Sequence, residues 1–324
     1  MTASTPQLSI VGSVFQGKET IEAFCRRVNE VVAPLGMSHE VVIVDDGSSD
    51  GTYEILERLQ SADPNLRVIR FSRNFGHHAA VTAALDHSRG EYVFMLDTDM
   101  QDDPGWLPGF LDKLRDEKVD VVYGHQTRRA GGLKDRIAGG MFWWVFNKIS
   151  EVKVPNNAVT ARVMTRRYVD ALIKLRESER FMAGMAAWVG FPQVGVPVTR
   201  AERGGGKTTY TFTKKVRLLL AAVTSFSAYP LRVATRAGLF MAFVGLAYGA
   251  YIVVHKLLYP ASVVSGWASL GSMMLIIGGM NLAMLGIVGL YLARTYEQAK
   301  GRPLYIVMEE LGEPGNDDPA GPSR

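Results

Sequence analysis

Short apolar runs alternate with amphipathic segments along the first 125 residues of the chain. The apolar runs predict strands at 8–15, 40–46, 66–72, 91–97 and 119–124. The periodicity of the segments between them predicts helices near 19–33, 52–61, 77–88 and 105–117. Such alternation is typical of a mostly parallel sheet with helices on both faces. We therefore predict an α/β domain whose ligands bind at the carboxyl ends of its strands.

The pattern changes near residue 237, where polar side chains almost disappear. From Ala237 to Ala293, His255 and Lys256 are the only histidine and the only charged residue. Two stretches, at about 237–258 and 267–293, have no polar face and are long enough to cross a hydrocarbon core of about 30 Å. A buried helical hairpin in a soluble domain is the alternative. The many glycines and the basic flanks favour a membrane hairpin of two transmembrane helices.

Basic residues flank the two predicted transmembrane helices and set their expected orientation. Arg232 and Arg236 precede the first, and Arg294, Lys300 and Arg302 follow the second. By the positive-inside rule, both ends of the hairpin face the cytoplasm. The N-terminus lacks a basic region followed by a long apolar one, so no signal peptide is evident. We predict a multi-pass protein of the inner (cytoplasmic) membrane, with its N-terminal domain in the cytoplasm.

These features divide the chain into four predicted parts. They are a domain over 1–212, an amphipathic interfacial helix over 213–232, the hairpin over 233–295 and a cytoplasmic tail over 296–324 with a disordered end. Lys214, Lys215 and Arg217 of the interfacial helix would face the anionic headgroups of membrane lipid. A core helix of the soluble domain is the alternative for this segment. In the tail, "RPLYIVMEE" is apolar enough to return to the soluble domain.

Composition excludes several classes of function. The chain has 36 Lys and Arg against 32 Asp and Glu, a net charge of +4, and no basic run interleaved with aromatic residues. We therefore expect no nucleic-acid partner. Cys25 is the only cysteine, which excludes disulfides within the chain and cysteine-based zinc sites.

Carboxylates follow two of the predicted strands. The segment "VVIVDDGSSDGT" (41–52) ends its strand at Asp45 and Asp46, which could accept hydrogen bonds from a base or ribose; an ordinary strand-to-helix turn is the alternative. In "DTD", Asp97 and Asp99 point the same way because residues i and i+2 of extended backbone share a face, and Gln101 continues the register. One or two carboxylates plus phosphate oxygens are a usual arrangement for Mg²⁺ or Mn²⁺.

Together with the C-terminal hairpin, the motifs "VDDGSSDGT", "RNFGHHAAVTAAL" and "LDTDMQDDP" resemble the family 2 glycosyltransferases. The resemblance is to the polyisoprenyl-phosphate glycosyltransferase group, which is similar to dolichol-phosphate mannose synthase, and it extends over most of residues 8–300. It implies a GT-A domain joined to membrane helices. It also implies metal-dependent, inverting transfer from a nucleotide-sugar, commonly to a lipid phosphate on the inner face of the membrane.

The resemblance assigns roles to individual residues. Substrate binding is expected at Ser13, Phe15, Asp45, Asp46, Asn74, Asp97, Thr98 and Lys207. The metal would be held by Asp97, Asp99 and Gln101. The residues expected to take part in catalysis are Asp99, Arg129 and Arg203, the two arginines lying near the diphosphate or the acceptor phosphate.

The sequence departs from the family pattern in places that bear on these roles. "SVFQG" (13–17) stands where the family has "PxYNE", and Gln126 replaces the first arginine of "GxRxxR". "GKTTY" (206–210) replaces "GESKY", which puts Thr209 at the lysine position and a lysine at Lys207. Thr160, in "VTARVMTR", stands where many relatives have an aspartate that is a candidate catalytic base.

The aspartate missing at Thr160 bears on the acceptor. A hydroxyl acceptor needs a base to remove its proton, but a phosphate with a second pKa of about 6 is already largely anionic at neutral pH. We therefore favour polyprenyl phosphate as the acceptor, in cell-envelope glycan synthesis or modification. The alternative is a base elsewhere, at Asp102 or Asp103, and a hydroxyl acceptor on a lipid-linked glycan. A catalytically inactive membrane scaffold is the remaining hypothesis, and the sequence leaves open whether the chain forms a homo-oligomer.

Overall fold

The computed structural model describes residues 5–126, 147–148, 150, 152–155, 157–178, 180–201, 227, 229–259 and 266–312. The chain divides into two compact units. The first has Met1–Trp143, Val152–Tyr210 and Arg302–Arg324, and the second has Trp144–Glu151 and Thr211–Gly301. Each unit is described by itself.

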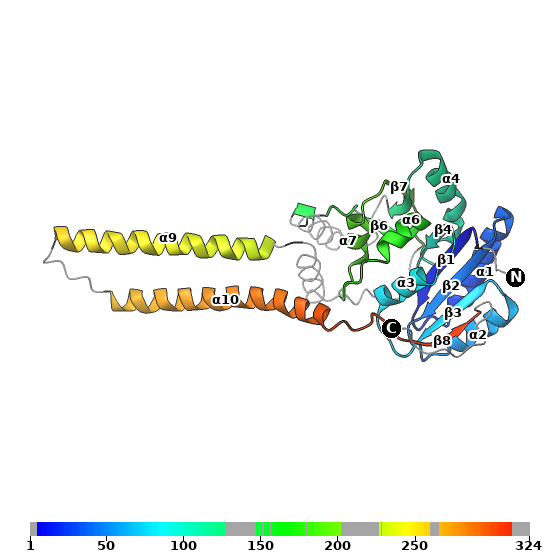
Figure 1. The fold of residues 1–324 in the computed structure, drawn as a ribbon, viewed down its shortest axis with the longest axis horizontal. Coiled ribbons are helices and arrows are strands. Elements are labelled where there is room, and N and C mark those ends of the chain that lie inside the picture. Colours follow the sequence, from blue (N-terminus) through cyan, green and yellow to red (C-terminus); the bar gives the residue numbers. More distant parts are fainter. Residues whose placement is uncertain are drawn as a thin grey trace. The chain divides into compact units, whose positions relative to one another are not determined.

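The first unit contains one mixed sheet (Figure 1). Its eight strands are β1 (Leu8–Val14), β2 (His39–Asp45), β3 (Leu66–Phe71), β4 (Tyr92–Met95), β5 (Val121–Gln126), β6 (Ala158–Thr165), β7 (Gln193–Val198) and β8 (Val307–Leu311), in the order β7-β5-β6-β4-β1-β2-β3-β8. Strands β4, β1, β2 and β3 are mutually parallel, and β7 is parallel to β5. Only β6 and β8 run antiparallel to their neighbours. The predicted α/β fold with a mostly parallel sheet is confirmed.

The central strands are almost entirely buried because helices cover both faces of the sheet. Every residue of β1 is buried, and so is every residue of β2 after His39. The covering helices are α1 (Ile21–Val32), α2 (Thr52–Ala62), α3 (His77–Asp86), α4 (Leu107–Glu117), α6 (Arg166–Leu172) and α7 (Met182–Trp188). In α1 the residues Ile21, Phe24, Val28 and Val32 form the stripe that faces the core. The four helices predicted from periodicity correspond to α1 through α4.

Strands β6 and β7 were not predicted from the sequence. In β6 the residues Val159, Ala161 and Val163 are buried and alternate with half-buried positions. This alternation is a strand signal, but it lies within a segment that we interpreted only by its motif. In β7 the chain "QVGVPV" has a proline, which is tolerated because β7 is the edge strand of the described sheet.

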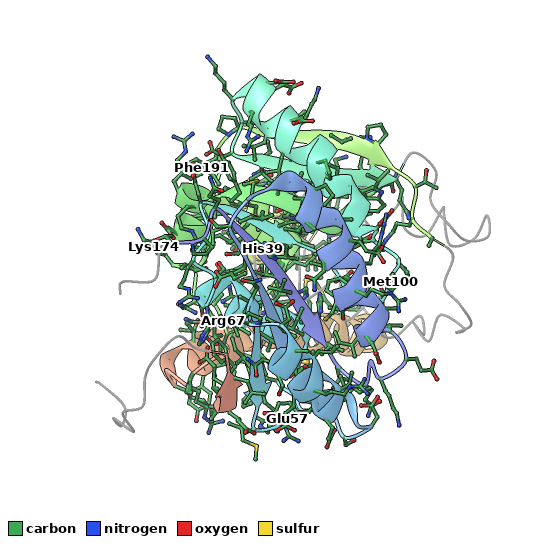
Figure 2. The ribbon with its side chains drawn as sticks, turned by 90° about the vertical axis from the view of Figure 1, so that its right-hand side faces the viewer. His39, Glu57, Arg67, Met100, Lys174 and Phe191 are labelled. Carbon is green, nitrogen blue, oxygen red and sulfur yellow. The ribbon has the colours of Figure 1, made fainter. Side chains whose placement is uncertain are left out.

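The segment after the second long helix returns to the sheet, as its apolar composition predicts. Strand β8 pairs with β3, and Arg67, labelled in Figure 2, places its Nη2 2.8 Å from Oε1 of Glu310. The ring of Tyr305 stacks on Phe71 with centroids 5.0 Å apart, and its hydroxyl donates a hydrogen bond of 2.8 Å to Asp86. The described part of the tail is therefore an integral edge of the sheet.

The second unit has two long helices, α9 (Tyr229–Leu258) and α10 (Trp267–Ala299), which lie side by side in Figure 1. Gly238 lies at their contact, where a Cβ would come within 3.3 Å of Met284. The predicted apolar stretches lie within these helices. Helix α9 begins at Tyr229 and so includes the last residues of the segment that we predicted as an interfacial helix; most of that segment lies outside the described residues.

Both helices carry an apolar surface that nothing in the described chain covers. Their apolar parts, Tyr229–His255 and Ile276–Ala299, each contain an 18-residue window in which no residue is buried, with mean hydropathies of 2.0 and 1.9. At about 1.5 Å per residue, each helix is longer than a hydrocarbon core of about 30 Å. Exposed apolar surface of this extent indicates association with a membrane.

Candidate active site

The turn after β4 carries the "DTD" sequence and is fixed to the end of β1. Thr98, in the middle of the turn, is buried, and its hydroxyl donates a hydrogen bond of 2.8 Å to the backbone oxygen of Ser13. The two segments approach closely, since a Cβ at Gly12 would lie 2.9 Å from Cγ2 of Thr98. Because Thr98 is turned inward, Asp97 is left half-buried and Asp99 exposed on either side of it. Both carboxylates therefore lie at the carboxyl edge of the sheet.

A cavity of about 710 Å³ opens at this edge. Its volume falls within the range of about 300–1,000 Å³ that is usual for small-molecule sites. Its lining includes five residues that we predicted to bind substrate or metal, namely Ser13, Phe15, Asp97, Thr98 and Asp99. It also includes Lys18, Asp50 and His77, which the sequence analysis did not place in the site. The fold therefore brings the end of β1, the start of α3 and the turn after β4 to one cavity.

His77, the first residue of α3, connects two sides of the cavity. Its Nδ1 lies 3.0 Å from the hydroxyl oxygen of Ser13, within hydrogen-bond distance. Its Nε2 lies 3.7 Å from Oδ1 of Asp97, which is too far for a hydrogen bond but close enough for an electrostatic contact. The glycine at position 76, with φ of +97°, directs the chain into α3 and so positions the ring.

Asp45 and Asp46, at the end of β2, accept hydrogen bonds from backbone nitrogens. Asp46 is buried, and its two carboxylate oxygens accept hydrogen bonds of 2.7 and 2.9 Å from the backbone nitrogens of Phe75 and Gly76. Oδ1 of Asp45 accepts a hydrogen bond from the backbone nitrogen of Ser48 at 3.1 Å, and burial raises the pKa of both carboxyl groups. The Asp45 contact is that of an ordinary strand-to-helix turn, whereas Asp46 joins the end of β2 to the segment between β3 and α3. Neither residue lines the cavity. Their role in nucleotide binding stays a prediction.

Asn74 and Gln101 also lie outside the cavity lining. Asn74 is exposed, and its backbone packs against Gly47, where a Cβ would lie 2.8 Å from the Asn74 nitrogen. Gln101 contacts Asp99 through its backbone nitrogen, which donates a hydrogen bond of 3.0 Å to Oδ1. Metal binding by the Gln101 side chain therefore stays a prediction.

Arg200, two residues after β7, contacts two carboxylates near the cavity. Its Nε lies 2.6 Å from Oδ1 of Asp102, and its Nη2 lies 3.3 Å from Oδ2 of Asp97. Asp102 is fully buried, and burial raises its pKa to about 6 against the opposing effect of the Arg200 cation. Asp103 caps the turn at Pro104–Trp106 and pairs with Arg27 at 3.2 Å. The two aspartates that we considered as alternative bases are thus both held in ion pairs.

Thr160, the position where an aspartate was expected, lies on β6 next to the turn after β4. Met95 pairs with Arg162 in the antiparallel ladder between β4 and β6. Because the strands are antiparallel, the register carried two positions further brings Thr160 opposite Asp97. The position is therefore close to the cavity edge, and a hydroxyl stands there in place of a carboxylate.

The two carboxylates of the "DTD" turn fit a divalent cation. Oδ1 of Asp97 is buried and accepts no hydrogen bond from the described residues, and Asp99 is exposed. No group of three or more His, Cys, Asp or Glu residues in the described chain is arranged to hold a metal. Two carboxylates suffice where phosphate oxygens complete the coordination, as is usual for Mg²⁺. The residues present therefore suit a cation that binds together with a nucleotide diphosphate.

Three predicted site residues, Arg129, Arg203 and Lys207, lie outside the described residues. Their roles rest on the sequence and stay predictions.

Comparison with known proteins identifies the family. Residues 9–170 match Glycosyl transferase family 2, and residues 229–295 match the GtrB C-terminal hairpin. The glycosyltransferase YkcC of Bacillus subtilis, named as uncharacterized, is 36% identical over 308 residues, which cover 94% of this chain and 94% of that protein. The bactoprenol glucosyl transferase of Shigella phage SfV is 35% identical over 304 residues, which cover 94% of this chain and 99% of that protein.

Among solved structures, a mannosyltransferase from Pyrobaculum calidifontis in complex with GDP-Man and Mn²⁺ covers 87% of this chain and 88% of its own, with 19% identity and a TM-score of 0.45. A likeness at this level carries no inference about the ligands of this chain. The family match and the two relatives establish the family without this structural likeness. The chain is a glycosyltransferase that belongs to Glycosyl transferase family 2 and carries a hairpin of the GtrB type.

Proposed function

We propose that the protein transfers a sugar, with inversion, from a nucleotide-sugar to polyprenyl phosphate at the cytoplasmic face of the inner membrane. The product would be a lipid-linked sugar for cell-envelope glycan synthesis or modification. The observation that carries the proposal is the pair Asp97 and Asp99 at a cavity of about 710 Å³ in a family 2 chain that also has a GtrB-type hairpin. The name of the phage relative, a bactoprenol glucosyl transferase, supports the acceptor.

In this proposal Asp97 and Asp99 hold Mg²⁺ or Mn²⁺ and the nucleotide lies along the cavity. The cation, when bound, supplies positive charge that neutralises the departing diphosphate. Ser13, Phe15 and Thr98 shape the wall against which the nucleoside binds. Arg129 and Arg203, together with Lys207, would steady the negative charges of the donor diphosphate and the acceptor phosphate.

The acceptor is proposed to be a phosphate because the residues that the structure describes offer no evident base. Thr160 stands where relatives have an aspartate, and both Asp102 and Asp103 are engaged by arginines. A phosphate oxygen that is already anionic attacks the anomeric carbon from the face opposite the nucleotide and needs no proton removed. A hydroxyl acceptor on a lipid-linked glycan remains the second candidate.

The path of the chain supports the proposed orientation. Strand β8 follows α10 and pairs with β3 in the same sheet as β1, which precedes α9. The chain therefore leaves the sheet unit before the hairpin and rejoins it afterwards, so two spanning helices would have both outer ends on one side of the membrane. The basic flanking residues Arg232, Arg236 and Arg294 favour the cytoplasmic side.

The proposal is tested with the purified full-length chain in detergent. Polyprenyl phosphate, a panel of nucleotide-sugars and either Mg²⁺ or Mn²⁺ should yield a labelled lipid that extracts into organic solvent. The Asp99→Ala variant should abolish this product, while Glu22→Ala, which changes an exposed carboxylate paired with Arg58 on the helical surface, should not. Transfer only to a sugar-bearing lipid would establish the hydroxyl acceptor instead. Nucleotide binding without turnover for every donor would favour the scaffold.

A further inference from the structure

The Arg200 side chain links two carboxylates that lie five positions apart in the sequence. Its Nη2 contacts Oδ2 of Asp97 at 3.3 Å and its Nε contacts Oδ1 of Asp102 at 2.6 Å. The Asp102 side chain is fully buried, and those of Asp97 and Arg200 are 21% and 22% exposed. Charges removed from water in this way interact more strongly than surface pairs, so the guanidinium is a substantial part of the local field.

The backbone reinforces this link. The nitrogen of Ala201 donates a hydrogen bond of 3.2 Å to the backbone oxygen of Gln101. The segment that leaves β7 is therefore fastened to the turn after β4 both by a main-chain hydrogen bond and by the Arg200 side chain. The arginine has little freedom to move away while this bond is made.

The two oxygens of Asp97 are in different situations. Oδ2 contacts Arg200, whereas Oδ1 is buried, accepts no hydrogen bond from the described residues and has Nε2 of His77 3.7 Å away. A buried carboxylate oxygen without a hydrogen-bond partner is unfavourable unless a ligand completes it. The arrangement thus fixes the carboxylate by one oxygen and leaves the other for a partner that is absent from the described chain.

We propose that Arg200 is a positioning residue of the metal site: it holds Asp97 by Oδ2, so that Oδ1 would be left for a divalent cation, and its charge would weaken binding of the bare cation. This inference rests on the proposed role of Asp97 as a metal ligand. A cation that binds next to a fixed guanidinium meets a like charge, and the nucleotide diphosphate supplies the negative charge that offsets it. Arg200 would therefore make the site bind the cation together with the donor in preference to the cation alone.

The first test measures Mn²⁺ binding by the full-length protein in detergent without nucleotide, from the electron paramagnetic resonance signal of the free ion. In Arg200→Gln the like charge is removed, and we expect the bare ion to bind about tenfold more tightly. Arg200→Lys keeps the charge and should stay within about threefold of wild type. The matched control is Arg27→Gln, which removes the exposed arginine paired with the neighbouring Asp103 and should change nothing.

The second test separates orientation from charge. Arg200→Gln should lower kcat at saturating donor and Mn²⁺ by tenfold or more, because Asp97 loses the contact that orients it. Arg200→Lys should recover part of this loss. Arg200→Gln leaves the buried Asp102 without its arginine and could destabilise the protein. The double variant Arg200→Gln with Asp102→Asn removes both charges of this ion pair and so avoids an unpaired buried carboxylate. The double variant should melt close to wild type and bind bare Mn²⁺ within about threefold of it, but keep the lowered kcat.

The outcomes distinguish this inference from the proposed function. If wild type binds Mn²⁺ and transfers sugar, but Arg200→Gln and the double variant match it within twofold in both affinity and kcat, Arg200 is only structural and the inference fails. Weaker binding of bare Mn²⁺ by a folded Arg200→Gln protein also overturns it. If wild type binds no Mn²⁺ with or without nucleoside diphosphates, the proposed metal role of Asp97 fails, and the inference fails with it.

Discussion

The two ends of the central strands both bury carboxylates, but they treat them in opposite ways. At the amino end, Oε1 of Glu40 accepts hydrogen bonds from the Ser9 hydroxyl and the Arg89 backbone, and Oε2 accepts from the guanidinium groups of Arg67 and Arg89. At the carboxyl end, Asp45, Asp97 and Asp102 each have one buried oxygen that accepts no hydrogen bond from the described residues. Both oxygens of Glu40 are thus satisfied within the chain, whereas each of the three carboxylates at the carboxyl end has one oxygen without a hydrogen-bond partner among the described residues.

The pKa values of the carboxyl groups also differ between the amino and carboxyl ends of the strands. Burial would raise the pKa of Glu40, but its hydrogen bonds and the two arginine cations bring it below the ordinary value. Burial raises the pKa of Asp45 and Asp46, and their hydrogen bonds do not compensate for it. The contrast teaches that buried charge by itself does not mark a functional site. Incomplete hydrogen bonding at the ligand edge of the sheet is the more informative sign.

The largest expected effect is on catalysis at the carboxyl end. Asp99→Asn keeps the size of the side chain but removes the charge that would hold the cation, and we expect kcat to fall by about 10³-fold or more, equivalent to about 4 kcal/mol. Because Asp99 is exposed, the unfolding temperature should hardly change. The measurement is the rate of lipid-linked product formation, with a melting curve of the same sample. A variant that remains fully active would remove Asp99 from the mechanism.

The next effect is on stability at the amino end. Glu40→Ala leaves the buried Arg67 and the adjacent Arg89 without their carboxylate, and we expect the sheet unit to lose about 3–5 kcal/mol of stability. The check is the denaturant midpoint of the full-length chain in detergent, followed by tryptophan fluorescence. Glu22→Ala is the matched control, because its pair with Arg58 is exposed and should contribute about 0–1 kcal/mol. Equal effects of the two substitutions would contradict the comparison.

A third prediction concerns pH, where the two ends should respond with opposite sign. The pKa of Glu40 is lowered on folding, so its contribution is present above the unfolded value near 4.5 and is lost as pH falls through the folded pKa. The pKa of Asp45 is raised, so the contribution of its protonated form is present below the unfolded value near 3.8 and is lost as pH rises through the folded pKa. The measurement is the melting temperature of wild type, Glu40→Gln and Asp45→Asn between pH 3 and 7. The difference between wild type and Glu40→Gln should change with pH in the direction opposite to the difference between wild type and Asp45→Asn.

The smallest expected effect is at His77. Removal of the ring in His77→Ala deletes the contact with Ser13 and opens the cavity wall, so we expect the KM for the nucleotide-sugar to rise about fivefold with little change in kcat. His77→Gln, which can still donate a hydrogen bond, should recover most of the affinity. Steady-state kinetics over a range of donor concentrations would show the difference. A loss confined to kcat would place His77 in the chemical step instead.

The sequence predicted the elements whose signals are local. Strands β1 to β5 and helices α1 to α4 follow from apolar runs and periodicity, and the "DTD" turn lies where the rule for parallel sheets puts ligands. Strands β6, β7 and β8 were not predicted as strands. The alternation in β6 lies in a segment that we interpreted only by its motif, and β7 contains a proline. The pairing of Leu311 in β8 with Val68 in β3 spans the whole hairpin, and a short window of sequence carries no sign of it.

The same physical reason explains which site residues were found. Asp97, Thr98 and Asp99 are adjacent in the chain, so their shared location was predictable. Arg200 and His77 reach Asp97 only through the folded sheet, and one arginine among many carries no signal of its own. Asp45 and Asp46 were expected beside the nucleotide; the structure shows both accepting hydrogen bonds from backbone nitrogens, and their role in nucleotide binding stays a prediction. Sequence spacing located the strand end but not the direction of each side chain there.

The return of β8 to the sheet has a consequence for how the protein is made. Because Val307–Leu311 follows the whole hairpin, the edge of β3 that pairs with β8 has no partner strand until the chain beyond α10 has been synthesised. An open strand edge is prone to pair with other chains. The sheet can therefore reach its full set of strands only after the whole hairpin has been synthesised, so the formation of this edge depends on the chain on both sides of the two long helices.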